Sequence, residues 1–212
     1  MDRVAMLETM AAMQDAHNTQ VHPQWRTRGY EYYRAVWVEC AELLDHFGWK
    51  WWKRQHPDLE QVKLELVDIW HFGMSDLMRA GALDAEVAAI LDVDPVANAD
   101  AGQFRRAVED LAHATLSARA FALKEFARTM ALLPLPYAEL FRLYVGKNVL
   151  NRFRQDHGYQ AGTYVKVWAG REDNEHLIEL LDDLDCPETA VTDLYERLDA
   201  RYPGGRVVAA AD

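Results

Sequence analysis

The strongest constraint on the fold is the helical spacing of apolar residues along most of the chain. The clearest stripe recurs at intervals of three and four residues and consists of Leu59, Val62, Leu66, Ile69 and Gly73. That period turns one face of a helix toward a core. Runs that alternate apolar and polar residues, as strands do, are almost absent. The sequence therefore predicts an all-α fold, a multi-helix bundle.

Capping residues, Gly and Pro mark where the helices begin and end. We predict helices over 3–17, 30–47, 59–80, 84–91, 103–133 and 137–157, then an extended segment over 158–170 and two short helices starting at Asp173 and Glu188. Asp58 is the expected N-cap of the third helix, and Gly81 follows its last turn. With no internal repeat and no long linker, 1–203 is expected to be one domain and 204–212 a flexible tail.

Composition and charge exclude several classes of protein. Half of the 212 residues are apolar, which is too many for a disordered chain. Thirty-four acidic against 23 basic residues give a net charge of −11, which argues against a nucleic-acid partner. No apolar run approaches the roughly 20 residues that span a bilayer, so no membrane partner is expected. Two cysteines and no targeting segment lead us to expect a cytoplasmic protein.

Two pairs of acidic residues are the first candidates for chemistry. Glu39 and Glu42 are three residues apart on one predicted helix, and Glu65 and Asp68 are three apart on the next. Residues at this spacing lie about 5–6 Å apart on one helix face. If the two helices pack antiparallel, both pairs meet, and hard divalent cations such as Mg²⁺ would offset their mutual repulsion. The spacing thus predicts a metal site.

A plainer interpretation of these acids is a solvated helix face. In that case Lys63, Arg34 or Lys50 would pair with them. Cys40, between the first two acids, is expected to be a small buried hydrophobe rather than a nucleophile, because no paired base is evident.

A basic segment interrupts the acidic chain over 147–171. Five cations and one acid give it a local charge of 5 − 1 = +4. Lys147, Asn151 and Arg154 are spaced i, i+4 and i+7, so they share a helix face that suits phosphate oxygens. The alternative is a solvated basic face that balances acids elsewhere.

Three tryptophans, Trp49, Trp51 and Trp52, follow the predicted end of the second helix. Aromatic clusters usually lie in the core, and we expect at least one of the three to be buried. An exposed indole can also stack on a nucleobase.

Together these motifs resemble, in chain order, the dimeric all-α dUTPases, a family within the all-α nucleoside triphosphate pyrophosphatases of the MazG-like superfamily. The similarity extends from about residue 14 to 174. It is carried by ECAELLD over 39–45, WKWWK over 49–53, ELVDIWHF over 65–72, GKNVLNRFRQDHGY over 146–159, GTYVKVW over 162–168 and EDN over 172–174.

The resemblance implies a homodimeric hydrolase that converts dUTP, and also dUDP, to dUMP and so keeps uracil out of DNA. A water activated by two or more Mg²⁺ ions would attack, with Glu39, Glu42, Glu65 and Asp68 as metal ligands and Glu42 orienting that water. Substrate contacts are implied for Gln14 and Asn18 at the uracil edge, Trp52 against the base, His71 and Phe72 near the sugar, and Lys147, Asn151, Arg154, Tyr159, Lys166 and Asn174.

Several alternatives remain open from the sequence. Asn18 could instead cap the end of its helix, and His71 could be an ordinary core histidine. The enzyme could prefer another base, as in a dCTP or noncanonical-nucleotide pyrophosphatase. A catalytically inactive helical regulator is the alternative from a different class.

Overall fold

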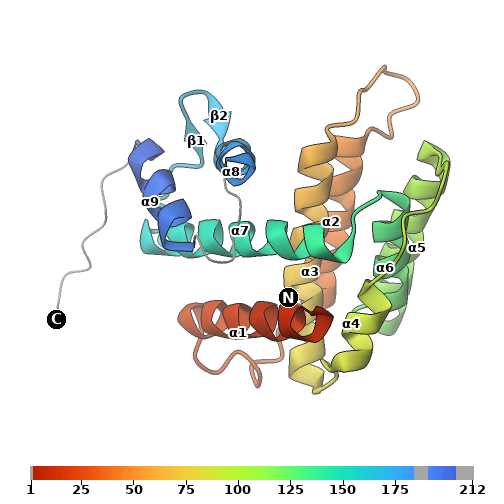
Figure 1. Ribbon diagram of the computed structural model, residues 1–212, viewed down its shortest axis with the longest axis horizontal. Helices are drawn as coiled ribbons and strands as arrows, with labels where there is room; N and C mark the ends of the chain where they lie inside the picture. Colours follow the sequence, from red (N-terminus) through yellow and green to blue (C-terminus); the bar gives the residue numbers. More distant parts are fainter. Residues whose placement is uncertain (1, 184–190, 204–212) are drawn as a thin grey trace. The chain divides into compact units, whose positions relative to one another are not determined.

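The computed structural model describes residues 2–183 and 191–203. Its elements are α1 (Arg3–Val21), α2 (Tyr32–Phe47), α3 (Leu59–Ala80), α4 (Ala85–Leu91), α5 (Ala101–Ala118), α6 (Leu123–Leu132), α7 (Tyr137–Asp156), β1 (Val167–Trp168), β2 (Arg171–Glu172), α8 (Asp173–Asp182) and α9 (Val191–Arg201). The strands form one short antiparallel hairpin in which Val167 pairs with Glu172. The predicted all-α class is confirmed (Figure 1).

The chain divides into two compact units, Met1–Phe141 and Arg142–Asp212. The boundary falls inside α7, so one continuous helix belongs to both units. A single domain over 1–203 stays a prediction. Residues 204–212 and the helix start expected at Glu188 lie outside the described part of the chain.

The first unit is built on α2 and α3, which pack side by side as an antiparallel pair (Figure 1). The antiparallel pair α5 and α6 contacts it through α2, while α1 packs across α3 and α4 joins α1 to α6. Helix α2 buries one stripe at helical spacing, formed by Val36, Cys40, Leu43 and Phe47. The apolar residues that recur at helical spacing in the sequence therefore form the contacts between helices that hold this unit together.

Both predicted caps of α3 are confirmed. The Asp58 side chain accepts a hydrogen bond from the Gln61 backbone N–H, and Gly81 ends the helix in the left-handed region at φ 68°. Inside the helix, Gly73 faces the Phe121 ring, and an added Cβ would come within 2.5 Å of it. The glycine of the apolar stripe thus makes room for an aromatic side chain from another segment.

The single long helix expected over 103–133 is wrong, because the chain breaks between α5 and α6. Arg119 ends α5 in the left-handed region at φ 51°. Two residues later, the Phe121 backbone N–H donates to the buried Asp76 carboxylate at 2.9 Å. Asp76 also accepts from Arg79 at 2.6 Å. A tertiary hydrogen bond and the Phe121 contact in the core therefore override the helical propensity of this stretch.

The second unit contains most of α7, the hairpin, α8 and α9. Gly146 lets α7 approach α8 closely, since a Cβ there would lie 2.6 Å from Leu181. An aromatic cluster fills the interior around Phe153, whose ring stacks on His157 at 3.9 Å and meets Trp168 and Tyr202 edge-on. The cluster gives this small unit a core of its own.

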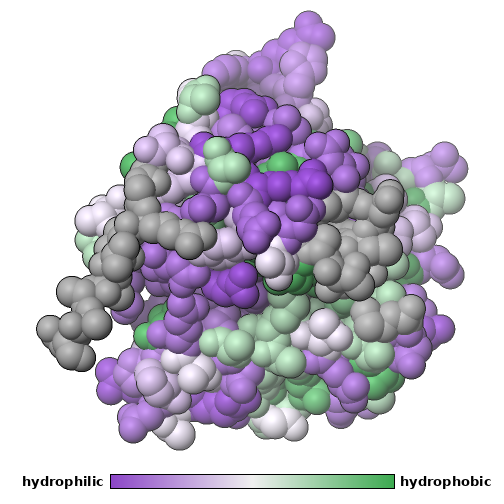
Figure 2. Space-filling model, turned by 60° about the vertical axis from the view of Figure 1, so that its left-hand side comes forward, coloured by the Kyte–Doolittle hydropathy of each residue, from purple (hydrophilic) through white to green (hydrophobic). Residues whose placement is uncertain are grey.

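Hydrophilic side chains cover most of the face drawn in Figure 2, with smaller hydrophobic patches between them. Among the helices that the structure describes, none combines the length and the apolar character needed to cross a membrane.

Candidate metal and nucleotide site

The predicted meeting of the acidic pairs is observed between α2 and α3. Glu39 and Glu42 project from α2, and Glu65 projects from α3 toward them. Oxygen atoms from these three side chains all lie within 4.8 Å of one another. Glu65 is buried, Glu39 half-buried and Glu42 exposed, so the cluster opens to solvent on the Glu42 side.

The electrostatics of Glu39 report how closely the four acids interact. Burial, together with the charges of Asp68, Glu65 and Glu42, raises the pKa of Glu39 to about 9. Asp68 is thus part of the same electrostatic cluster, as its position three residues after Glu65 predicts. A set of carboxylates that repel one another and offer only oxygen atoms fits a hard divalent cation.

The three basic residues considered as partners of these acids lie elsewhere. Lys63 binds Glu60 and Glu139 at 3.1 and 2.9 Å. Arg34 pairs with Glu31 at 2.7 Å, and Lys50 pairs with Asp45 at 3.0 Å. These three cations thus pair with other acids, and the burial of Glu65 differs from what a solvated face would give, while the metal site stays a prediction.

Two histidines and one cysteine border the cluster. His46 Nε2 lies 3.6 Å from a Glu65 oxygen. His71 is buried, donates from Nδ1 to the Val67 carbonyl at 2.8 Å, and has the same nitrogen 3.9 Å from Asp68. Burial raises the pKa of the Cys40 thiol to about 12, so Cys40 stays a protonated, buried hydrophobe as expected.

Gln14 and Asn18 form a buried polar network with a third residue, Ser75 of α3. The Gln14 amide donates to Asn18 Oδ1 at 3.0 Å and to Ser75 Oγ at 3.1 Å. The Asn18 amide donates to Ser75 Oγ at 3.0 Å, and Ser75 in turn donates to the His71 carbonyl. Helix α1 continues to Val21, so the alternative that Asn18 caps its end is wrong.

Sequence reasoning missed Ser75, because a lone serine in a helix carries no motif. Its position, four residues after His71 and seven after Asp68, places all three on one face of α3. That face links the carboxylate cluster to the amides of α1.

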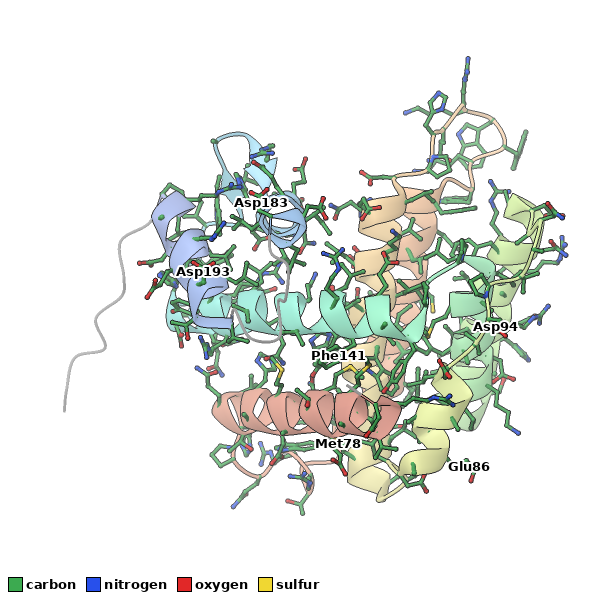
Figure 3. All side chains as sticks on the ribbon, in the orientation of Figure 1. Met78, Glu86, Asp94, Phe141, Asp183 and Asp193 are labelled. Carbon is green, nitrogen blue, oxygen red and sulfur yellow. The ribbon has the colours of Figure 1, made fainter. Side chains whose placement is uncertain are left out.

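The tryptophan loop between α2 and α3 is exposed. Trp49, Trp51 and Trp52 keep 45%, 90% and 57% of their surface accessible, so the expectation that one of them is buried is wrong. In Figure 3 this loop extends beyond the ends of α2 and α3 and carries several ring-bearing side chains. Trp52 meets both neighbouring indoles edge-on, at 5.3 and 5.4 Å.

The loop is nonetheless held by specific hydrogen bonds. Gln55 Oε1 accepts from the backbone N–H groups of Trp49 and Lys50 at 3.0 and 2.7 Å. Arg105 of α5 donates from Nε to the Gly48 carbonyl at 2.8 Å. An open pocket of about 260 Å³ is lined by these residues and by Phe47, Trp51, Lys53 and Pro57. Exposed indoles on an ordered loop are suited to stacking on a planar ligand.

In the second unit, several predicted phosphate-binding residues gather around Arg154, which forms an ion pair with Asp173. Arg154 donates to the two Asp173 oxygens from Nε and Nη2 at 2.8 and 2.9 Å. Asn174 Oδ1 accepts from Lys147 at 2.9 Å and from Arg154 at 3.3 Å. Asn151 Oδ1 accepts from Arg154 Nη1 at 3.2 Å. Asp173 belongs to the EDN motif at 172–174, but only its neighbour Asn174 was predicted to contact substrate.

Two further candidates of this unit lie at its surface. Tyr159 is half exposed, and its ring centre lies 5.9 Å from the Arg154 guanidinium carbon. Lys166 pairs with Glu172 at 3.0 Å. The remaining candidate, Phe72 of the first unit, is half-buried on α3.

An all-α fold that gathers carboxylates from two antiparallel helices beside a buried amide network defines a class, the helical enzymes that act on nucleotides. A sequence model described as dUTPase matches residues 6–159 of this chain, which is more than half of it. The chain belongs to this dUTPase family. The comparison with curated proteins finds no match.

Family membership gives the chain its activity, the hydrolysis of dUTP as a dUTP diphosphatase. Its substrate is a nucleotide, and the family requires a divalent metal ion. The matched residues include all four carboxylates and the tryptophan loop, whereas Lys166 and Asn174 lie beyond them.

Proposed function

We propose that the chain hydrolyses dUTP to dUMP and pyrophosphate with two or more Mg²⁺ ions held by Glu39, Glu42, Glu65 and Asp68, and that it also accepts dUDP. The observation that supports this most directly is the cluster of three carboxylates within 4.8 Å of one another. Burial and the charges of the neighbouring acids raise the pKa of Glu39 in this cluster to about 9. Such a cluster favours a small divalent cation that prefers oxygen ligands.

Within this proposal, the buried and the exposed carboxylates of the cluster have different roles. When bound, Mg²⁺ supplies positive charge to the phosphate oxygens and acidifies a coordinated water. The buried Glu65 is shielded from bulk solvent, so its role is to hold the ion. Glu42 is the exposed member, which suits it to orient the attacking water or accept its proton.

Base and sugar selection are assigned to the first unit. Gln14 and Asn18 would hydrogen-bond the uracil edge, since their amides are fixed by Ser75 in a buried network. Trp52 would stack on the base, because its indole is accessible and its loop is ordered. His71 and Phe72 would lie near the deoxyribose, one turn after Asp68 on α3.

We retain the proposed substrate contacts of the second unit, with Lys147, Asn151, Arg154 and Lys166 at the phosphate oxygens and with Tyr159 and Asn174 as further substrate-binding residues. Support comes from contacts inside the second unit, where hydrogen bonds of 2.9–3.3 Å hold a guanidinium, an ammonium and two amides together. Such a group of donors can neutralise charge that develops in a phosphoryl transition state.

We further propose a homodimer in the cytoplasm. Exposed apolar side chains on α2, Trp37 and Val38, are 40% and 39% accessible, which is consistent with a surface that a second copy covers. Light scattering at micromolar protein should give twice the monomer mass of 24.3 kDa. A mass of one monomer would contradict the dimer.

The experiment that tests the function is a panel of eight nucleotides, ribo and deoxy, assayed for pyrophosphate release in Mg²⁺ and in EDTA. We expect dUTP to be the preferred substrate, ribonucleotides to be poor, and EDTA to stop turnover until Mg²⁺ is restored. Equal rates on dUTP, dCTP and UTP would favour a general pyrophosphatase. Release that persists in EDTA would contradict the metal mechanism.

A further inference from the structure

Asp173, the first residue of α8, is a buried acid whose side chain accepts three hydrogen bonds. Its side chain has no accessible surface. One oxygen accepts from Arg154 Nη2 at 2.9 Å, and the other accepts from Arg154 Nε and from the Tyr164 hydroxyl, both at 2.8 Å. The carboxylate therefore binds one edge of the guanidinium with both oxygens, which fixes its plane as well as its distance.

Backbone contacts fix Asp173 independently of its side chain. Its N–H donates to the Lys166 carbonyl at 3.0 Å, and Glu172 forms a capping box with Glu175 at the start of α8. The carboxylate is thus held by a helix start and a strand pair rather than by a flexible loop.

The surroundings of Asp173 also favour its ionised form. Burial alone would raise the pKa of this carboxyl, but the hydrogen bonds and charge of Arg154 outweigh it and hold the pKa below its ordinary value. Asp173 is therefore an anion at neutral pH and binds Arg154 as a charged acceptor.

Asn174, the residue after Asp173, adds hydrogen bonds to Arg154 and to Lys147. Asn174 Oδ1 lies between Arg154 Nη2 and the buried Lys147 ammonium, at 3.3 and 2.9 Å. Two consecutive residues at the start of one helix thereby bind two of the three cations proposed to contact phosphate, Lys147 and Arg154. A salt bridge that served stability alone would not require this shared acceptor.

We infer that Asp173 is a positioning residue that sets the orientation of Arg154 for phosphate. The inference rests on the proposed function, in which Arg154 contacts the phosphate chain. Asp173 itself touches no substrate and acts through the guanidinium. Misplacing such a donor by about 1 Å costs on the order of 100-fold in rate.

A double-mutant cycle tests this. Asp173→Asn, which keeps the shape and removes the charge, should lower kcat about 10–100-fold with a smaller change in KM. Arg154→Ala should lower kcat about 10²–10³-fold. If Asp173 acts through Arg154, adding Asp173→Asn to Arg154→Ala should bring no further loss. Losses that multiply across the two changes would overturn the inference.

Binding of inorganic pyrophosphate, measured by calorimetry on the same variants, separates this inference from the proposed function. Both single variants should weaken pyrophosphate binding, and the double variant should be no weaker than Arg154→Ala. A wild type that hydrolyses no dUTP but gives this pattern would contradict the proposed function and support the positioning role. Unchanged pyrophosphate binding in Asp173→Asn would overturn it.

Two further variants guard against a purely structural effect. Asp173→Glu keeps the charge but moves the carboxylate by one methylene, so kcat should fall although the ion pair persists. Full activity in Asp173→Glu would overturn the inference. Asp193→Asn removes the same charge from an exposed pair with Arg197 on α9, where the ions are 2.9 Å apart, and should leave kcat and KM unchanged.

Discussion

Glu39 of α2 and Glu65 of α3 bring carboxyl oxygens within 4.8 Å of each other. Two carboxylates held this close repel each other, which favours a proton on one of them. Burial and the surrounding acids hold that proton on Glu39, whose pKa rises to about 9. At neutral pH and without a cation, the cluster therefore keeps a proton that a divalent ion must displace.

The first prediction concerns stability against pH. The pKa of Glu39 is raised from 4.5 to about 9, so its stabilising contribution is complete below pH 4.5 and is lost as pH rises toward about 9. In EDTA, the thermal midpoint should therefore fall over this range, and saturating Mg²⁺ should reduce the fall. Circular dichroism melts would measure both. Glu39→Gln should flatten the EDTA curve, and an unchanged slope would contradict the assignment.

The second prediction concerns Glu42. Glu42→Gln preserves the shape of the side chain but removes an anionic ligand, so turnover should be abolished while the helical spectrum stays intact. The matched control is Glu60→Gln, an exposed acid of α3 whose partner is Lys63. It should retain near-normal activity. Near-normal activity of Glu42→Gln in Mg²⁺ would show that the site is assigned to the wrong residues.

The third prediction concerns Ser75, which fixes both amides of α1. Ser75→Ala leaves the Gln14 and Asn18 amides without this acceptor, at a cost of about 1–3 kcal/mol. We expect kcat/KM for dUTP to fall roughly 5- to 150-fold, and the preference for dUTP over dCTP to narrow. Steady-state kinetics on both nucleotides would measure this. Thr19→Ala, at an exposed position of α1, is the control, and an equal loss there would refute the role of Ser75.

The fourth prediction concerns Gly73. Alanine normally stabilises a helix interior by about 1 kcal/mol relative to glycine. At Gly73 its Cβ would lie 2.5 Å from the Phe121 ring, so Gly73→Ala should instead destabilise the protein by about 1–3 kcal/mol. Chemical denaturation would measure the change. In the double variant with Phe121→Leu, the loss in free energy of unfolding should be smaller than the sum of the losses in the two single variants. Strictly additive losses would mean that the contact between residue 73 and the Phe121 ring is not the cause.

The sequence predicts the carboxylate cluster well because helix geometry is local. Glu39 and Glu42, like Glu65 and Asp68, meet at a spacing that any helix imposes. Asp58 and Gly81 likewise mark the ends of α3 through local hydrogen bonding. The spacing within each pair and the two caps need no knowledge of the rest of the fold, whereas the meeting of the two pairs depends on the packing of α2 against α3.

Features that depend on distant residues were not predictable in the same way. The break after Ala118 depends on a hydrogen bond from Phe121 to Asp76, which lies 45 residues earlier in the chain. The role of Asp173 depends on Arg154, 19 residues earlier. Spacing in the sequence marks Arg154 as a phosphate candidate, but it marks neither the pairing of Arg154 with Asp173 nor the bond from Phe121 to Asp76, so only the folded chain reveals these contacts.

The exposed tryptophan loop also gives the protein an optical reporter. Trp25, Trp70 and Trp168 are buried, at 2%, 0% and 1% accessibility, whereas Trp51 is 90% accessible. Iodide in solution should therefore quench the fluorescence of the loop and spare the interior indoles. A nucleotide stacked on the loop would shield it, so occupancy could be followed by emission alone, without a label and before any turnover.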